Sequence, residues 1–403
     1  MDLRSQRLRN WILLGLLFVF LFALESVVVH NAFTVRYPGA NDFYSRWAGA
    51  RALILEGRDP YSLEVTEEIQ PVIGIDPSEV GRGGFAYPLY VIFLFWPLVF
   101  VSYAWAQAIW MVTLQWVAVG IAIVLMRREG LEPSPVGAVG LLLGTLFLYP
   151  VTRTIFLGQF TLHVTLSLAA TLLALQHERD GWAGAFLALS AVKPQMVILI
   201  GPWLVLWAIS QRRWRFICGL LIGGAVLGIG SLALFPRWPI SFLEDVRRYD
   251  DFAGGRTPVA MVGDLIWPQN PDIVRYGLTG VLLLAMGAAW VRGWRGSEEA
   301  FGPATYWTIV VSLLVFFQTG TTNYVMLLVP FFAWLRAALD RWGVWPAVGG
   351  TAVLEVALWG LFAATISGDW ENPVMFLVLP LLSLAVLVGS ELVRWRRTDD
   401  AAT

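Results

Sequence analysis

Long apolar runs recur along this chain from end to end, and they constrain its fold more than any other feature. Runs of about 18 or more residues recur, which is enough for a helix to cross the hydrocarbon core of a bilayer. Hydrophobic residues make up 57% and charged residues 14% of the 403 residues, whereas soluble domains carry about 25% charged residues. The sequence therefore predicts an all-α polytopic membrane protein, with residues 1–403 forming a single membrane domain.

Basic residues predict the side of the membrane on which the two ends lie. Arg4, Arg7 and Arg9 precede the first apolar run, residues 11–29, and further arginines close the chain. Because cytoplasmic flanks are enriched in Lys and Arg, both termini are expected in the cytoplasm, so the number of crossings is even. The first run is longer than the core of a signal peptide and lacks a small-residue cleavage site, so we expect it to be retained as a helix.

Further spanning helices are expected at the later apolar runs, which are residues 85–103, 104–126, 136–152, 160–176, 182–210, 216–234, 274–291, 303–318, 323–336, 344–366 and 373–391. Two polar stretches between them, residues 30–84 and 235–272, are expected to be external loops. The integral membrane protein is expected in a bacterial plasma membrane.

Two topologies account for the middle of the chain, each with about twelve crossings in total. In the first, residues 85–103 and 104–126 both span. In the second, residues 85–103 form a re-entrant or surface segment, and residues 182–210 form two short helices broken at Lys193-Pro194-Gln195. The second topology places Arg127-Arg128 inside, as the positive-inside rule favours.

A helix is also predicted inside the first external loop. Asn41 or Asp42 is a good N-cap and Gly57 is a good C-terminal stop. An apolar stripe on this helix is typical of an amphipathic helix that lies on the outer membrane surface. The stripe consists of Phe43, Trp47, Ala50 and Ile54.

Asp42 has two interpretations at the start of that helix. It is either a capping aspartate or a general base that removes the proton of a sugar hydroxyl as that hydroxyl attacks a lipid-linked donor. Arg46 has a similar pair of interpretations, as a phosphate ligand or as an arginine on a solvated face. Asp59-Pro60 predicts a turn.

Polar residues inside apolar runs form a second set of candidates. A lysine at membrane depth is costly unless it faces a cavity or a partner, so Lys193, with Gln195 beside it, is a candidate for binding the phosphate of a polyprenyl phospho-sugar. The alternative is a lysine that reaches the interface from a helix end. Gln159, with Arg153 before it and His163 after it, is a second polar group, although a single Gln often only joins two membrane helices.

The sequence lacks the usual signals of metal, ATP and nucleic-acid binding sites. Three His and one Cys without metal-ligand spacing predict no metal site. No Gly-rich loop precedes Lys-Ser or Lys-Thr, so ATP is not expected, and no other cofactor is implied. A net charge of −1 gives no indication of nucleic acid as a partner.

Several short motifs, taken in their order and spacing, resemble glycosyltransferase family 87. They are Asp42-Phe43-Tyr44, Ala48-Gly49-Ala50-Arg51, Gly57-Arg58-Asp59-Pro60-Tyr61, Tyr87-Pro88, Leu157-Gly158-Gln159, and Ala183-Gly184 followed by Lys193-Pro194. The resemblance is clearest over residues 40–200. That family consists of polyprenol-phosphate-mannose-dependent α-mannosyltransferases and relatives with the membrane glycosyltransferase fold called GT-C.

The resemblance implies a GT-C fold and a metal-independent, inverting transfer of a sugar, with mannose expected, from a polyprenyl-phosphate donor to a glycolipid or glycan acceptor on the outer face. Asp42 would be the catalytic base, and Lys193 and Gln159 would line the donor pocket. The acceptor is expected at residues 235–272 and 318–324, where Asp250, Asp251, Asn323 and Tyr324 are candidates. The predicted substrate-binding residues are Arg46, Asp59, Tyr61, Tyr87, Arg153, Gln159, His163, Lys193, Gln195 and Asn323.

Two departures from the family pattern leave the identity of the transferred sugar undecided. Leu89 stands where the family has a second proline, and residues 160–163 lack the Asn that often follows Gly-Gln.

A secondary transporter or lipid-linked sugar flippase is the alternative function, although no half-to-half repeat of the kind common in transporters is found. A catalytically inactive relative that binds lipids or partners is the third.

Overall fold

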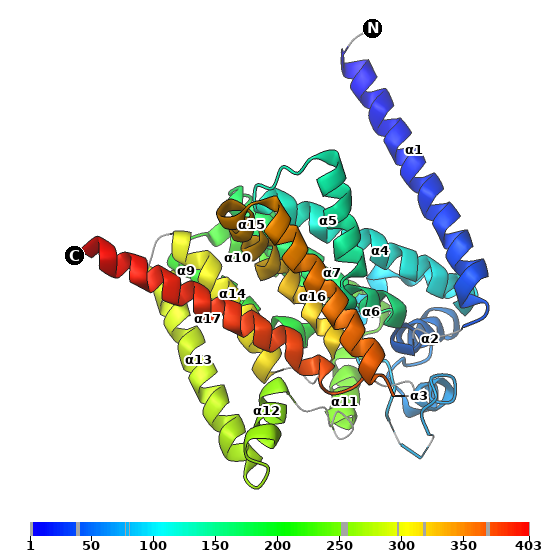
Figure 1. Ribbon diagram of the computed structural model, residues 1–403. Coiled ribbons are helices and arrows are strands. Elements are labelled where there is room, and N and C mark those ends of the chain that lie inside the picture. Colours follow the sequence, from blue (N-terminus) through cyan, green and yellow to red (C-terminus); the bar gives the residue numbers. More distant parts are fainter. Residues whose placement is uncertain are drawn as a thin grey trace. The chain divides into compact units, whose positions relative to one another are not determined.

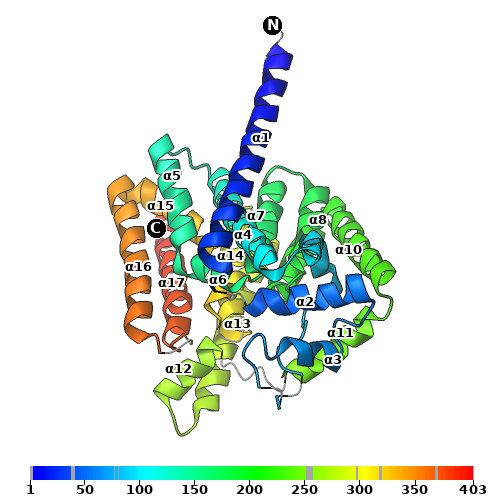
Figure 2. The ribbon, with the colours of Figure 1, turned by 90° about the vertical axis from the view of Figure 1, so that its right-hand side faces the viewer.

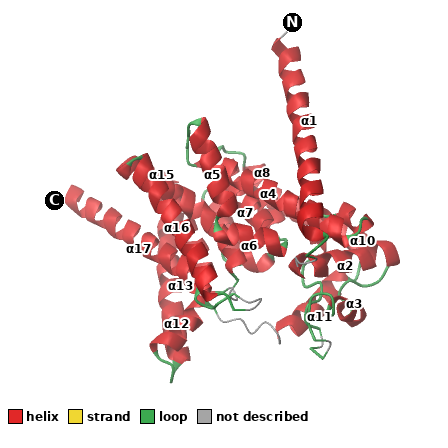
Figure 3. Cartoon of the chain, turned by 45° about the vertical axis from the view of Figure 1, so that its right-hand side comes forward, coloured by secondary structure: helices red, strands yellow, loops and turns green. Residues whose placement is uncertain are grey.

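A computed structural model of the chain describes residues 3–37, 41–76, 78–79, 81–250, 257–295, 298–316, 320–367 and 371–402. Helices make up nearly all of the regular structure in these ranges (Figure 3). The chain forms two compact units. The N-terminal unit contains residues 1–117, 155–159 and 237–249, and the C-terminal unit contains residues 118–154, 160–236 and 250–403. The predicted single membrane domain stays a prediction.

The N-terminal unit consists of long membrane helices and a group of short helices (Figure 1). Its elements are α1 (Leu3–Val29), the π-helical turn η1 (His30–Thr34), α2 (Asn41–Glu56), α3 (Leu63–Ile69), the 3-10 helices η2 (Leu89–Leu94) and η3 (Trp96–Phe100), the first part of α4 (Tyr103–Arg128), the end of α6 (Tyr149–Leu157) and α11 (Trp238–Asp250).

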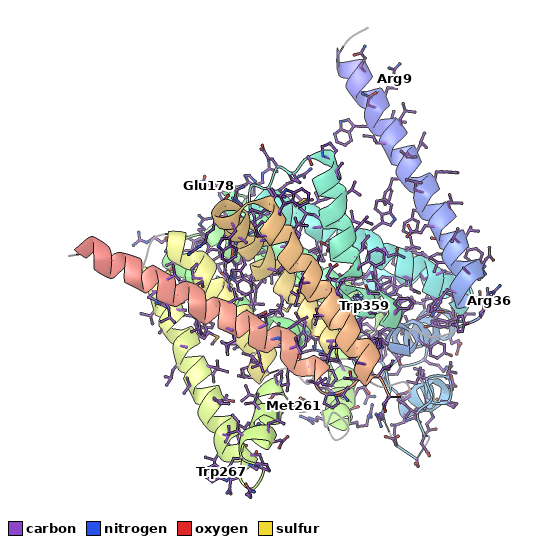
Figure 4. All side chains as sticks on the ribbon, viewed as in Figure 1. Arg9, Arg36, Glu178, Met261, Trp267 and Trp359 are labelled. Carbon is purple, nitrogen blue, oxygen red and sulfur yellow. The ribbon has the colours of Figure 1, made fainter. Side chains whose placement is uncertain are left out.

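Helix α1 is apolar all round, and its apolar window is only 6% buried. In Figure 4 the side chains of the segment between the labelled Arg9 and Arg36 point outward from the ribbon. An apolar helix of this length that is left uncovered needs lipid as its solvent. Its one acidic side chain, Glu25, accepts a hydrogen bond from Trp116 Nε1 of α4 at 3.1 Å, which supplies a polar partner at membrane depth.

Helix α2 forms where the sequence predicts a helix, but its apolar stripe is buried inside the N-terminal unit. Phe43 and Ala50 are fully buried, and the Phe43 ring stacks on Trp110 with centroids 5.0 Å apart. Trp47 Nε1 donates a hydrogen bond to the Leu98 carbonyl at 2.8 Å. The expectation that this stripe faces the membrane surface is therefore wrong. Periodicity shows that a face is apolar, but it does not show whether lipid or protein covers it.

The segment over residues 85–103 does not form a full spanning helix. It folds as η2 and η3, and Phe95 between them, with φ −143° and ψ 8°, lies outside the helical region. Pro88 and Pro97 explain the break, because proline has no N–H to continue a helix. Likewise α8 (Asp180–Ser190) and α9 (Ile200–Ser210) are separate helices with the 3-10 helix η4 (Pro194–Val197) between them. Both findings agree with the second of the two predicted topologies.

Seven helices in the described part of the chain are long and apolar enough to cross a membrane. The number is up to eight if the bent pair α5 (Pro135–Phe147) and α6, which meet at 57°, counts as one span. Three further helices are also apolar but are shorter, with 10–17 residues each. The chain is thus an all-α polytopic membrane protein, consistent with a GT-C type fold, and the number of about twelve crossings stays a prediction.

The C-terminal unit contains most of the remaining helices. They are α7 (Thr161–Gln176), α8, η4, α9, α10 (Trp214–Leu234), α12 (Pro258–Ile266), α13 (Pro271–Arg295), α14 (Glu298–Val315), η5 (Thr321–Leu327), α15 (Leu328–Trp342), α16 (Val344–Thr365) and α17 (Met375–Ala402).

Helices α8 and α10 lie side by side (Figure 2) and touch through their backbones. A Cβ placed on Gly184 would come within 2.0 Å of the Phe216 carbonyl oxygen, and one on Gly219 within 2.0 Å of the Gly181 carbonyl oxygen. Only glycine fits at such contacts, and small residues of this kind let membrane helices approach closely.

Candidate active site

A predicted catalytic carboxylate and two predicted binding residues meet in the N-terminal unit. Gln159 Nε2 donates a hydrogen bond to Asp42 Oδ2 at 2.7 Å. Tyr87 OH lies 3.2 Å from Gln159 Oε1 and donates to it. Because the phenol occupies the amide oxygen, the amide NH₂ group is the side that faces the carboxylate. Residues from three separated parts of the sequence thus form one hydrogen-bonded chain.

Asp42 lies in the first turn of α2 and is partly buried. A carboxylate in this position is stabilised by the N-terminal end of the helix dipole. Gln159 follows Gly158, whose φ of +71° is the left-handed conformation that glycine adopts without strain. This turn ends α6 and directs the Gln159 amide to α2 within the same unit.

Arg46 is part of the same group of residues. Its guanidinium carbon lies 4.5 Å from the centroid of the Tyr87 ring, and Nη1 donates to the Asp42 carbonyl at 3.0 Å. The side chain is 8% exposed, and its buried Nε has no hydrogen-bond partner among the described residues. A buried N–H of a cation without a partner is costly. This atom is therefore available to an anionic ligand.

Asp59 and Tyr61 fix the position of the Tyr87 backbone. Tyr61 OH donates to the Tyr87 carbonyl at 2.8 Å in a buried position. Asp59 Oδ1 accepts from the Tyr61 backbone N–H at 2.9 Å, which is the turn chemistry predicted for this aspartate. Asp59 Oδ2 accepts from Ser241 Oγ at 2.7 Å. These contacts are structural, and a role of Asp59 or Tyr61 in binding substrate stays a prediction.

Helix α11 adds two residues that the sequence did not single out, Asp245 and Arg248. Asp245 is 1% exposed, and its Oδ2 accepts from the Ala86 backbone N–H at 2.8 Å. Ala86 has a φ of +49°, a conformation that is uncommon for residues other than glycine. Arg248 Nη2 donates to the Tyr61 carbonyl at 2.7 Å and lies 3.4 Å from Asp245 Oδ1. The pair fixes the turn that precedes Tyr87.

The electrostatics of Asp245 reflect its burial. Burial raises the pKa of its carboxyl above the ordinary value, while the Ala86 N–H and the cations Arg248 and Arg46 act in the opposite direction. No local sequence signal marks this residue, because the contact between Asp245 and Ala86 joins positions more than 150 residues apart.

Lys193, the only lysine in the sequence, is buried in the C-terminal unit. It is 5% exposed and follows α8 at the predicted break. Its Nζ donates to Asn323 Oδ1 at 2.8 Å and to Thr161 Oγ1 at 3.3 Å. Both of these oxygens carry no formal charge. A buried ammonium at membrane depth is a candidate for holding an anion.

Arg153 lies near a second polar group in the same unit. Its Nε is 3.9 Å from Glu371 Oε2. Glu371 Oε1 accepts from Thr321 Oγ1 at 2.6 Å and also from the Tyr149 hydroxyl. Because Thr321 and Asn323 both belong to η5, this short helix contacts Glu371 at one position and Lys193 at another. Glu371 lies outside the predicted candidates, and nothing in its local sequence marks it.

The remaining candidates lie in different settings. His163 is partly buried on α7, with its ring 6.2 Å from that of Phe160, and Gln195 is exposed on η4. Tyr324 is buried and donates to the Phe376 carbonyl at 2.6 Å, which is a packing contact. Asp251 and the side chain of Asp250 lie outside the described residues. Within the described residues, no three acidic, His or Cys side chains gather as metal ligands.

The fold and these side chains define a class: an all-α polytopic membrane protein with a carboxylate and buried cations in polar settings. A family model described as glycosyltransferase family 87 matches residues 85–319, which is more than half of the chain. The chain therefore belongs to glycosyltransferase family 87 and is a membrane glycosyltransferase. The match decides against the alternative of a transporter or flippase. No curated protein and no solved structure matches the chain.

The matched segment extends further toward the C-terminus than the resemblance seen in the sequence, which is clearest over residues 40–200. Tyr87, Gln159 and Lys193 lie within it. Asp42 and Arg46 precede it, so their place in the site depends on the geometry around Gln159 and Tyr87.

Proposed function

We propose that the protein transfers mannose from a polyprenyl-phosphate donor to a glycolipid or glycan acceptor on the outer face of the membrane, with Asp42 as the general base. The observation that carries this proposal is the 2.7 Å hydrogen bond from Gln159 to Asp42. A carboxylate that serves only as a helix cap needs the helix N–H groups alone. A carboxylate held by a side chain from outside its own helix, here from the turn after α6, has one oxygen fixed in direction.

In the proposed reaction, Asp42 takes the proton of an acceptor hydroxyl as the hydroxyl oxygen forms a bond to the anomeric carbon of the donor. The bond from that carbon to the phosphate oxygen breaks, and polyprenyl phosphate leaves with the electron pair. Attack from the side opposite to the leaving group inverts the configuration. Gln159 engages Oδ2, so Oδ1 is the oxygen to which we assign the proton transfer.

Lys193 and Arg46 have separate roles in the proposed reaction. We assign the donor phosphate to Lys193, because a buried ammonium stabilises negative charge as it develops on a leaving group. Arg46, with its buried Nε, is a further candidate for an anionic group of either substrate. The scheme assigns no step to a metal or a cofactor.

Transfer by purified protein in nanodiscs tests the proposal. The protein is incubated with polyprenyl-phosphate-mannose, or with the glucose analogue, and with a panel of glycolipid acceptors. We expect mannose transfer, and a loss of about 10²–10⁴-fold in kcat for Asp42→Asn, the usual contribution of a general base. Asp76→Asn is the matched control, because Asp76 is an exposed aspartate of the same loop.

Unchanged transfer by Asp42→Asn would overturn the assignment of the base. Turnover with the glucose donor alone would replace mannose and leave the base in place. An anomeric configuration retained in the product, determined by NMR, would contradict the single displacement.

A further inference from the structure

A groove of about 780 Å³ lies between the first turns of α8 and α10, within the C-terminal unit. None of the candidate active-site residues lines it. Small residues on both helices create this space. The helices touch through Gly181 and Gly219, and Ala185 and Cys218 leave the hollow beside that contact unfilled.

The mouth of the groove carries positive charge. Arg213 Nη1 lies 3.1 Å from Asp180 Oδ1, so these two charges neutralise each other. Arg179 and Arg215 line the groove, are exposed and have no ion pair with any described residue. Glu178 is the remaining acidic side chain at the mouth. Both helices begin here, at Asp180 and Trp214, and helix N-termini favour anions.

The other end of the groove is apolar and continues along a membrane helix. Ile222 lines it and is 65% exposed. Helix α10 is one of the candidate spans, and its exposed face continues beyond Ile222 with Val226 and Ile229. Trp182 and Trp214 flank the mouth with 65% and 58% of their surfaces exposed. Exposed tryptophans of this kind mark the headgroup layer of a bilayer.

From this succession of cations, tryptophans and apolar surface we infer that the groove binds an anionic phospholipid. Arg179 and Arg215 contact the phosphate, and one acyl chain lies along Ile222. The volume suits a headgroup and the first part of a chain, since pockets for whole small ligands are about 300–1,000 Å³. A zwitterionic lipid fits the apolar part equally well, so the two arginines account for the preference for an anionic one.

The chain provides its own reporter, because its only cysteine, Cys218, is exposed and lines the groove. The full-length protein is labelled there with a small bimane fluorophore. It is then placed in nanodiscs of phosphatidylcholine and phosphatidylglycerol in a fixed ratio. In one preparation the phosphatidylglycerol carries brominated acyl chains, and in the other the same mole fraction of phosphatidylcholine carries them. Surface charge is thereby constant, and only the identity of the quencher changes.

We expect brominated phosphatidylglycerol to quench the fluorophore far more than brominated phosphatidylcholine. Two arginines give a preference on the order of tenfold or more at the groove. The variant Arg179→Gln/Arg215→Gln is expected to equalise the two preparations. Arg341→Gln is the matched control and keeps the difference, since Arg341 lies at the end of α15 and does not line the groove.

Equal quenching by the two brominated lipids in the unsubstituted chain would overturn the inference, because the groove would then take bulk lipid without regard to charge. Quenching by neither would show that no lipid enters it. Both outcomes are read without any variant, so they do not depend on whether a variant folds. Loss of the difference in Arg341→Gln would assign the preference to overall charge and would also overturn the inference.

Discussion

Gln159 occupies the central position of the candidate site at the scale of single residues. It donates to Asp42 and accepts from Tyr87. Removing its amide in Gln159→Leu leaves the carboxylate without that donor, and we expect kcat to fall about 10- to 100-fold, the value of a hydrogen bond to a charged group. Tyr87→Phe removes only the hydroxyl that orients the amide, and a loss of about fivefold is expected.

The double variant distinguishes a connected chain of hydrogen bonds from two independent contacts. If Tyr87 acts through Gln159, the two losses are not additive, and Tyr87→Phe has little further effect once Gln159 is Leu. Gln211→Leu, at an exposed glutamine after α9, is the control. Fully additive losses in kcat would contradict the proposed connection.

Lys193 gives a prediction in which stability and activity change in different directions. A buried ammonium carries a desolvation cost that hydrogen bonds only partly offset. Lys193→Met fills the space with an apolar chain of similar length, so we expect the thermal unfolding temperature to be retained or raised while sugar transfer is lost. Both are measured on the same preparation. A lower unfolding temperature together with normal transfer would show that Lys193 is structural.

Helix α11 illustrates what a whole element contributes. It holds the turn before Tyr87 through Asp245, whose folded pKa is raised by burial. A carboxyl with a raised folded pKa binds its proton more tightly in the folded state. Its contribution is therefore most favourable at pH values below the unfolded pKa, and is lost as pH rises through the folded pKa.

For this reason we expect Asp245→Asn to be more stable than the unsubstituted protein near pH 7, and the difference to disappear toward pH 4. The Asn carbonyl oxygen still accepts from the Ala86 N–H, so transfer is retained. Asp245→Leu lacks an acceptor and is expected to lose both stability and transfer. Thermal unfolding between pH 4 and pH 7 measures the effect. An Asn variant that is less stable at pH 7 would show that the ion pair with Arg248 outweighs the cost of burial.

The elements themselves were largely predictable from the sequence, and the partners of their faces were not. Proline and lysine in apolar runs located the breaks at residues 85–103 and at Lys193, because a missing N–H and a charge at membrane depth are local properties. The stripe containing Phe43 was equally visible, but Trp110, which covers it, lies 67 residues away. Asp245 and Glu371 were missed for the same reason, since their partners are distant in sequence.

At the scale of the whole molecule, the fold class follows from composition and run length, while the sidedness of the membrane depends on a statistical rule about arginines. That rule places the loop containing Asp42 outside and the turn containing Gln211 inside. Cysteines at Ser78 and at Gln211, both exposed positions, are introduced one at a time in a Cys218→Ser chain to test it.

In intact cells, a membrane-impermeant maleimide is expected to label Ser78→Cys and to leave Gln211→Cys unlabelled until the membrane is permeabilised. The Cys218→Ser chain without a new cysteine is the blank. The reverse pattern would invert the predicted topology and place Asp42 on the cytoplasmic face. The proposed acceptor chemistry would then move to that face, while the hydrogen-bonded group of Asp42, Gln159 and Tyr87 is the same in either orientation, because it lies within one compact unit.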